Sequence, residues 1–385
     1  MPLQPRIAPI ESLKPQEVMG RNGRCWCGSG DKWKACHRNR HLEPRPSYHE
    51  VKPGMAKLFA KGECGHPDAP KGCSGEAINS HTLQKGGALA ALAENGHVIS
   101  ARQATQRLFQ NKGRLVPQKT GVNSASTFPG FCNAHDTAFF LPIESGVLPL
   151  TRASAFLLSY RAMAYERHTK TAGLAGLSEM RRKGDAGLPF SAQVDVQQGL
   201  HHMTAGMRLG LEDLRVWKNQ LDQMYRSGDT SDIGLMAVTF EGVLPFVAAF
   251  GKLPTVDFQG LKRQSLMSRN VPTLSLTVTV AAGRTIAIFS WFDGPKSAGA
   301  KMAESFSNVG ENEKPSALLR YCLSSSENIH MRPSWWDGLT MEDLSDADVL
   351  IHMGLPLSDE GDPAHFVVGK GPLSLAPMAS EVVHL

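Results

Sequence analysis

Long hydrophobic runs are missing from this sequence of 385 residues. No stretch approaches the ~20 consecutive apolar residues that a membrane-spanning helix needs, so we expect no membrane partner. The opening residues MPLQPRIAPIESLKPQ lack the charged-then-apolar layout of a secretion signal, which favours a cytoplasmic location. Cysteine is also scarce, with seven in the chain. Six of the seven come before residue 133, and Cys322 stands alone. This distribution favours metal ligation over a disulfide framework and makes Cys322 a core thiol.

Recognisable catalytic motifs are absent from residues 150–385. This part has no phosphate-binding glycine loop and no nucleophile elbow. We therefore expect it to regulate, oligomerise or position a partner, and we look for chemistry before residue 150.

Three cysteines and a histidine are concentrated in CWCGSGDKWKACH, residues 25–37. Cys25 and Cys27 are too close in sequence to bridge to each other. A CxC pair, eight residues and then the adjacent Cys36 and His37 supply four soft ligands, the number that a closed tetrahedral zinc site needs. Gly28 and Gly30 allow a tight reversal between the two ligand pairs.

This pattern resembles the SEC-C motif, a small zinc-binding module of the preprotein translocase ATPase and of many bacterial proteins. The resemblance covers about residues 21–40, with the ligands Cys25, Cys27, Cys36 and His37. It implies a structural zinc ion and a docking surface for protein or nucleic acid. The alternative is a zinc staple for a short segment without a core of its own.

The positive charge of the chain is concentrated at the same end. Residues 1–60 contain eleven Lys and Arg against five Asp and Glu, whereas the whole chain carries a formal net charge of +5. Such an asymmetry favours an anionic partner, and nucleic acid is the commonest one. A solvated basic tail is the alternative. The Pro-rich stretch RHLEPRPSYHEVKPG then predicts a linker over residues 40–54.

A second group of candidate ligands follows the linker: Cys64, His66, Cys73, His81, Cys132 and His135. Cys132 and His135 lie three residues apart at the predicted start of a helix, so they face the same side. Together with Cys64 and Cys73 they have the layout of a treble-clef zinc site, which leaves His81 outside the zinc shell.

Residues 60–145 resemble, through INSH and GFCNAHD, the HNH or ββα-metal nucleases. The resemblance implies His81 as a general base on water, and Asp136 or His135 on the helix as a ligand of a catalytic Mg²⁺ or Mn²⁺. Bacterial nucleases of this kind with accessory domains suggest, by analogy, a role in defence against phage. Two alternatives stay open: His81 could replace Cys64 or His135 as a zinc ligand, and Asp136 could only hydrogen-bond a ligand histidine.

The remaining sequence alternates between helical and strand patterns. Apolar residues spaced three and four apart predict two long amphipathic helices that pack as a hairpin, within residues 151–170 and 191–226. LSLTVTV and TIAIFSWF, around the turn AAGR, predict a half-buried antiparallel hairpin.

We therefore predict an α+β multidomain protein with two structural zinc ions. Residues 1–45 form the SEC-C module, residues 55–147 a treble-clef or HNH-like zinc domain, and residues 148–385 an α+β domain that regulates or oligomerises. The leading hypothesis is a metal-dependent nuclease with His81 and Asp136 as catalytic residues. The alternative is a non-catalytic zinc adaptor that docks protein or nucleic acid.

Overall fold

The structure is a computed structural model, which describes residues 11–46, 54, 56–101, 114–144, 146–265, 273–353, 366–369, 371 and 373–385. The chain divides into two compact units, residues 1–61 with 169–213 and residues 62–168 with 214–385. Part of the predicted linker over residues 40–54 lies outside the described residues. The predicted boundaries 1–45, 55–147 and 148–385 stay predictions.

The first unit combines a small loop module with the ends of two long helices. The module contains the 3-10 helices η1 (Trp33–Ala35) and η2 (Arg40–Leu42), and the long helices are α5 (Arg152–Lys183) and α6 (Phe190–Ser227). Its core consists of Cys25, Trp26, Cys27, Trp33 and Cys36, with Phe190 and Val194 of α6 packed against it. The predicted long helices are confirmed.

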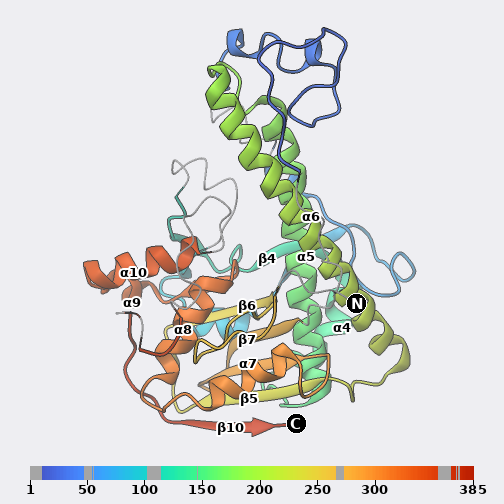
Figure 1. The fold of residues 1–385 in the computed structure, drawn as a ribbon. Coiled ribbons are helices and arrows are strands. Elements are labelled where there is room, and N and C mark those ends of the chain that lie inside the picture. The colour runs from blue at the N-terminus through green and yellow to red at the C-terminus, as the bar shows by residue number, and fades with distance from the viewer. Residues whose placement is uncertain are drawn as a thin grey trace, which may run out of the picture. The chain divides into compact units, whose positions relative to one another are not determined.

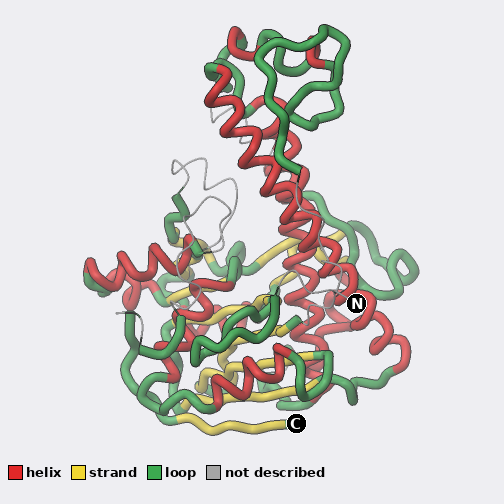
Figure 2. The backbone as a smooth tube through the Cα atoms, in the orientation of Figure 1, coloured by secondary structure: helices red, strands yellow, loops and turns green. Residues whose placement is uncertain are grey.

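The second unit is built on an eight-stranded sheet whose strands pair in the order β10-β5-β8-β7-β6-β9-β2-β3, all antiparallel (Figures 1 and 2). The strands are β2 (His97–Ser100), β3 (Gln118–Gly121), β5 (Gly234–Phe240), β6 (Phe246–Lys252), β7 (Leu274–Ala281), β8 (Arg284–Trp291), β9 (Ile329–Met331) and β10 (Ser380–His384). The predicted hairpin of β7 and β8 is confirmed. Its turn residues Ala282 and Gly283 both have positive φ, 49° and 73°, as a two-residue hairpin turn requires.

The prediction that this hairpin is half-buried is wrong. Every residue of β7 except Ala281 is buried, because helices cover both faces of the sheet. Leu276 and Val278 pack into the core under α7 (Ala298–Ser307), α8 (Lys314–Ser325) and α10 (Met341–His352). Thr277 lies opposite Ile288 on the other face, where Ile288 packs in one cluster with Tyr160 of α5 and Trp217 of α6. The alternating threonines therefore face a helix layer and not solvent.

A separate two-stranded sheet completes the second unit. β1 (Ala77–His81) pairs antiparallel with β4 (Thr127–Cys132), and α4 (Asn133–Phe140) follows β4 directly. Between β1 and β4, the chain forms the π-helix η3 (Lys85–Leu89) and α2 (Ala90–Leu92). It then forms β2 and β3, which are strands of the large sheet. That excursion explains why the sequence between His81 and Cys132 is longer than a simple hairpin. This unit also contains the short helices η4 (Leu141–Ile143) and α9 (Pro333–Asp337).

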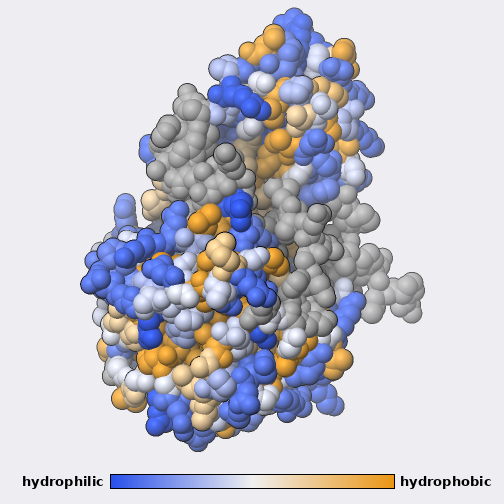
Figure 3. All heavy atoms as spheres, turned by 90° about the vertical axis from the view of Figure 1, so that its left-hand side faces the viewer, coloured by the Kyte–Doolittle hydropathy of each residue, from blue (hydrophilic) through white to orange (hydrophobic). Residues whose placement is uncertain are grey.

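The surface mixes polar and apolar side chains. On the face in Figure 3, hydrophilic residues surround scattered hydrophobic ones. Within the described ranges, no helix is both long enough and apolar enough to span a bilayer.

Candidate metal centres

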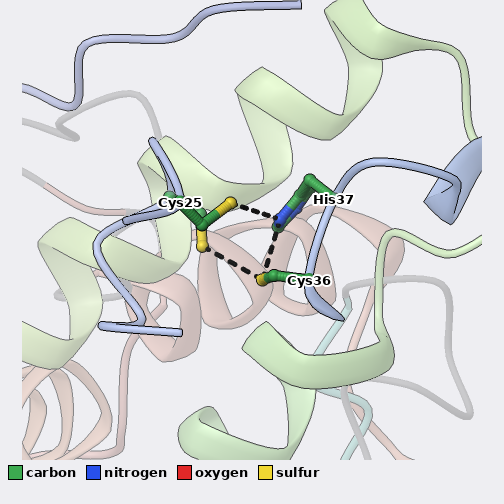
Figure 4. Close-up of side chains that lie close together, drawn as sticks. Cys25, Cys36 and His37 are labelled. Carbon is green, nitrogen blue, oxygen red and sulfur yellow. Dashed lines mark hydrogen bonds between the residues drawn. The ribbon is translucent and has the colours of Figure 1, made fainter. Parts of the chain in front are cut away.

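The first cluster contains the four predicted residues Cys25, Cys27, Cys36 and His37. Their ligand atoms all lie within 4.8 Å of one another, and all four residues are buried. Figure 4 shows Cys25, Cys36 and His37 pointing toward one another. The glycines between the ligand pairs have the expected positive φ, 76° at Gly28 and 84° at Gly30.

The separations within this cluster are those of the edges of a zinc tetrahedron. Zn–S bonds of about 2.3 Å and Zn–N bonds of about 2.0 Å give S···S edges of about 3.8 Å and S···N edges of about 3.5 Å. The Sγ atoms of Cys27 and Cys36 are 3.6 Å apart, and Nδ1 of His37 lies 3.3 Å from Cys25 Sγ and 3.1 Å from Cys36 Sγ. The cluster can therefore hold a metal ion, and its dimensions fit zinc.

A buried carboxylate holds the histidine of this cluster in place. Asp185 lies between α5 and α6, is 0% exposed, and its Oδ2 is 2.8 Å from Nε2 of His37 although the two residues are 148 apart in sequence. Arg40 donates to the other carboxylate oxygen at 2.7 Å, and Gln197 donates to Oδ2 at 2.9 Å. A carboxylate behind a ligand histidine fixes the ring and its tautomer, so that Nδ1 faces the metal position.

The electrostatics of this cluster favour a bound cation. Burial works against a charged imidazole at His37, but Asp185 and the neighbouring thiols raise its pKa to about 10. Hydrogen bonds with Cys25 and Cys36 lower the pKa of the Cys27 thiol below its usual value. Burial opposes the charge of Asp185, but its hydrogen bonds from His37, Arg40 and Gln197 lower its pKa. The pocket thus stabilises positive charge at the ring and a thiolate at Cys27, whereas hydrogen bonds with Cys25 and Cys27, together with burial, raise the pKa of the Cys36 thiol.

The second cluster brings together Cys64, Cys73, Cys132 and His135, the four residues predicted from the treble-clef layout. Nδ1 of His135 lies 3.4 Å from the Sγ atoms of Cys64 and Cys132 and 3.6 Å from that of Cys73. These separations match the S···N edges of a zinc tetrahedron as well as those of the first cluster do. The chain therefore contains two Cys/His clusters that can hold metal ions.

The second cluster is shaped by the start of α4. Cys132 is the N-cap of this helix. Burial opposes its thiolate, but backbone N–H groups of His135 and Ser74 outweigh burial and lower the pKa of Cys132 to about 6. His66 is not a ligand here, and its ring stacks on that of His135 with centroids 4.0 Å apart. Burial and the nearby His135 lower the pKa of His66 to about 4.

His81 and Asp136 are not members of the second cluster: Asp136 follows the cluster residue His135, and His81 lies opposite Thr127, at the other end of the β1–β4 pair from Cys132. His81 ends β1, and its Nε2 is 3.2 Å from the carbonyl oxygen of Val122. Asp136 lies in the first turn of α4, one residue after His135, and its Oδ1 is buried without a hydrogen bond to the described part of the chain. The two side chains are close enough that each influences the pKa of the other.

Two residues around these centres could not be found from sequence spacing. Asp185 is 148 residues from His37 in sequence, and residues 62–168 of the second unit lie between them. Arg161 of α5 is 3% exposed, pairs with Glu144 and also influences the pKa values of His81 and Asp136. Asp185 lies in the turn between α5 and α6, Arg161 lies in an amphipathic helix, and only the tertiary fold brings either residue to a cluster.

The sequence model of the SEC-C motif matches residues 21–39, which contain the whole first cluster. The resemblance predicted for residues 21–40 is confirmed. Comparisons with curated proteins and with solved structures gave no match. The resemblance of residues 60–145 to HNH nucleases is supported by none of these comparisons and stays a prediction.

Proposed function

We propose that this protein is a metal-dependent hydrolase of nucleic-acid phosphodiesters, with its reacting groups on the module formed by β1, β4 and α4. The observation that carries the proposal is the placement of His81 and Asp136. They come from the end of β1 and from the first turn of α4, the helix that follows the partner strand β4, each influences the pKa of the other, and both lie outside the second cluster. The four residues of that cluster hold the module together, since zinc binding free energy is folding free energy in small sites.

His81 is suited to act as the general base. A carbonyl oxygen only accepts hydrogen bonds, so Nε2 donates its hydrogen to Val122 and the lone pair of Nδ1 is left for a water molecule. Burial lowers the pKa of His81 from the usual 6.5, with positive charge on Lys85 and Arg161 acting in the same direction. The imidazole is therefore neutral near pH 7, as a base must be.

Asp136 is suited to hold a divalent cation. A carboxylate oxygen is a hard ligand of the kind that Mg²⁺ and Mn²⁺ prefer. Burial raises the pKa of Asp136, while the positive charge of Arg161 and the neighbouring Ser80 hydroxyl act in the opposite direction. A bound ion would supply charge stabilisation at the leaving oxygen. Asp136 would hold it, and His81 would take the proton of the attacking water.

The first cluster supplies a cationic surface for docking the nucleic acid. Five exposed basic side chains surround it: Arg21, Arg24, Lys32, Lys34 and Arg38. Such side chains bind phosphates without sequence preference, and this binding weakens as the salt concentration rises. The module could also dock an acidic protein through the same charges.

The test is divalent-metal-dependent cleavage of single-stranded and duplex DNA and RNA by wild type and His81→Ala, with zinc content measured on the same samples. We expect the substitution to reduce cleavage by about 10²–10⁴-fold, the usual contribution of a general base, without loss of zinc. Lys71→Ala, a substitution of an exposed residue in the same module, is the matched control. If neither wild type nor the control cleaves any polymer, the protein is a zinc adaptor and the hydrolase proposal fails.

A further inference from the structure

A cavity of about 20 Å³ lies in the second unit beside the module that carries His81. Its polar lining comes from three parts of the chain: Thr82 and Gln84 directly after β1, Arg161 of α5, and Thr277 and Thr279 of β7. A cavity of this size has room for about one water-sized oxygen atom. The large sheet thus supplies one wall of this cavity, whose other lining residues, Leu83, Ile143, Leu148 and Leu158 among them, are apolar, and Thr82 directly follows His81 in the chain.

Three polar atoms around this cavity are buried and make no hydrogen bond with the described residues: Thr82 Oγ1, Arg161 Nε and Thr277 Oγ1. The three residues are only 3%, 3% and 2% exposed. Each such atom costs ~1–3 kcal/mol when it stays unpaired. Since all three line the same cavity, a ligand atom seated there would satisfy them together.

The donors of the cavity select the chemistry of that atom. Arg161 carries a permanent positive charge, and its Nε–H can only donate. Its terminal nitrogen is paired with Glu144, and its guanidinium lies 4.1 Å from the centre of the Phe140 ring, so its orientation is constrained. The two threonine hydroxyls can also donate. Glu144 offsets the charge of Arg161 at the terminal nitrogen, and Nε–H with the two hydroxyls leaves a donor-rich pocket for one oxygen, which fits a phosphate oxygen as the acceptor.

We propose that this cavity seats a non-bridging oxygen of a nucleic-acid phosphodiester, held by Arg161, Thr82 and Thr277. The sheet domain then contributes directly to substrate binding, in addition to its supporting role. The phosphate chemistry follows from the cavity itself, whereas its assignment to nucleic acid rests on the proposed function. Free inorganic phosphate is the other source of the same chemistry.

The test uses Thr277→Val, which keeps the shape of the side chain and removes one unpaired hydroxyl. The matched control is Ser159→Ala. Ser159 lies on α5, and its buried hydroxyl also makes no hydrogen bond with the described residues but does not line the cavity. Binding of a fluorescent oligonucleotide and of inorganic phosphate is measured on the full chain with Ca²⁺ and at fixed salt, by anisotropy and by thermal shift. We expect Thr277→Val to weaken oligonucleotide binding by roughly 10–100-fold, the range of a hydrogen bond to a charged group, and the control to leave it unchanged.

The outcomes separate this proposal from the hydrolase proposal. Weaker binding of the oligonucleotide in Thr277→Val supports the phosphate seat, even if His81→Ala shows no loss of cleavage. An effect on inorganic phosphate alone overturns the assignment to nucleic acid. Equal binding of both ligands by Thr277→Val and Ser159→Ala overturns the proposal, because the cavity would then hold only water.

Discussion

Replacing Asp185 by asparagine tests how the first metal cluster is built into the first unit. The carboxylate accepts hydrogen bonds from His37, Arg40 and Gln197 and is fully buried. Asparagine has nearly the same shape, but its amide nitrogen would face hydrogen-bond donors and it carries no charge. The substitution therefore removes the support of a ligand histidine and leaves Arg40, which is 5% exposed, without its counter-charge.

The expected magnitude has two parts. Loss of a group that orients a ligand typically lowers metal affinity by about 10–100-fold. Leaving a buried charge unpaired typically costs about 3–5 kcal/mol of stability. We therefore expect Asp185→Asn to release one of two zinc ions at a much lower chelator concentration and to lower the unfolding temperature of the first unit.

The assay is stepwise zinc release to a chromophoric chelator, with wild type and Asp195→Asn as references. Asp195 is an exposed residue of α6, so its substitution makes the same change of charge outside the network. Because the second cluster lies in the other unit, only one release step should shift. Identical release curves for Asp185→Asn and Asp195→Asn would refute the role of Asp185.

Three further predictions concern other parts of the chain. Since burial lowers the pKa of His81 below 6.5, protonation should reduce cleavage only below that pH, and a loss of kcat/KM that begins at pH 7 or above would contradict the base assignment. Cys322 is 0% exposed and burial raises its pKa well above 9.0, so mass spectrometry should find it unalkylated by iodoacetamide in the folded, chelator-treated protein, where cysteines of the metal clusters react. Gly130→Ala would place a methyl group on the Phe128 ring and should lower the free energy of unfolding, measured in urea, by about 1–3 kcal/mol. Gly206→Ala in α6 meets nothing within 4 Å and should raise that free energy by about 0.5–1 kcal/mol. Equal effects of the two substitutions would contradict the packing around Gly130.

Local sequence spacing was enough to predict the first metal cluster and the long helices, whereas the second cluster was predicted from the treble-clef layout, because Cys73 and Cys132 are 59 residues apart. Cys25, Cys27, Cys36 and His37 lie within thirteen residues, so their spacing alone determines that they can converge. The 3.6-residue periodicity of α5 and α6 is equally local.

Contacts distant in sequence could not be predicted in the same way. Nothing near His37 indicates that its supporting carboxylate is Asp185. The threonines of β7 alternate with apolar residues as they would on a solvated strand, and only the packing of a second helix layer buries Thr277. The pairing of β2 with β3 and β9 in the large sheet also depends on tertiary packing, because the sequence of a short strand does not determine its neighbour in an antiparallel sheet.

The most direct test of the central claim is the number of zinc ions bound by the wild type, Cys36→Ser, Cys132→Ser and His81→Ala, measured by native mass spectrometry. If the protein has two structural metal centres and His81 belongs to neither, the wild type and His81→Ala should each bind two ions, and each cysteine variant should bind one. Loss of an ion in His81→Ala, or two ions retained in Cys132→Ser, would contradict the assignment of the second centre.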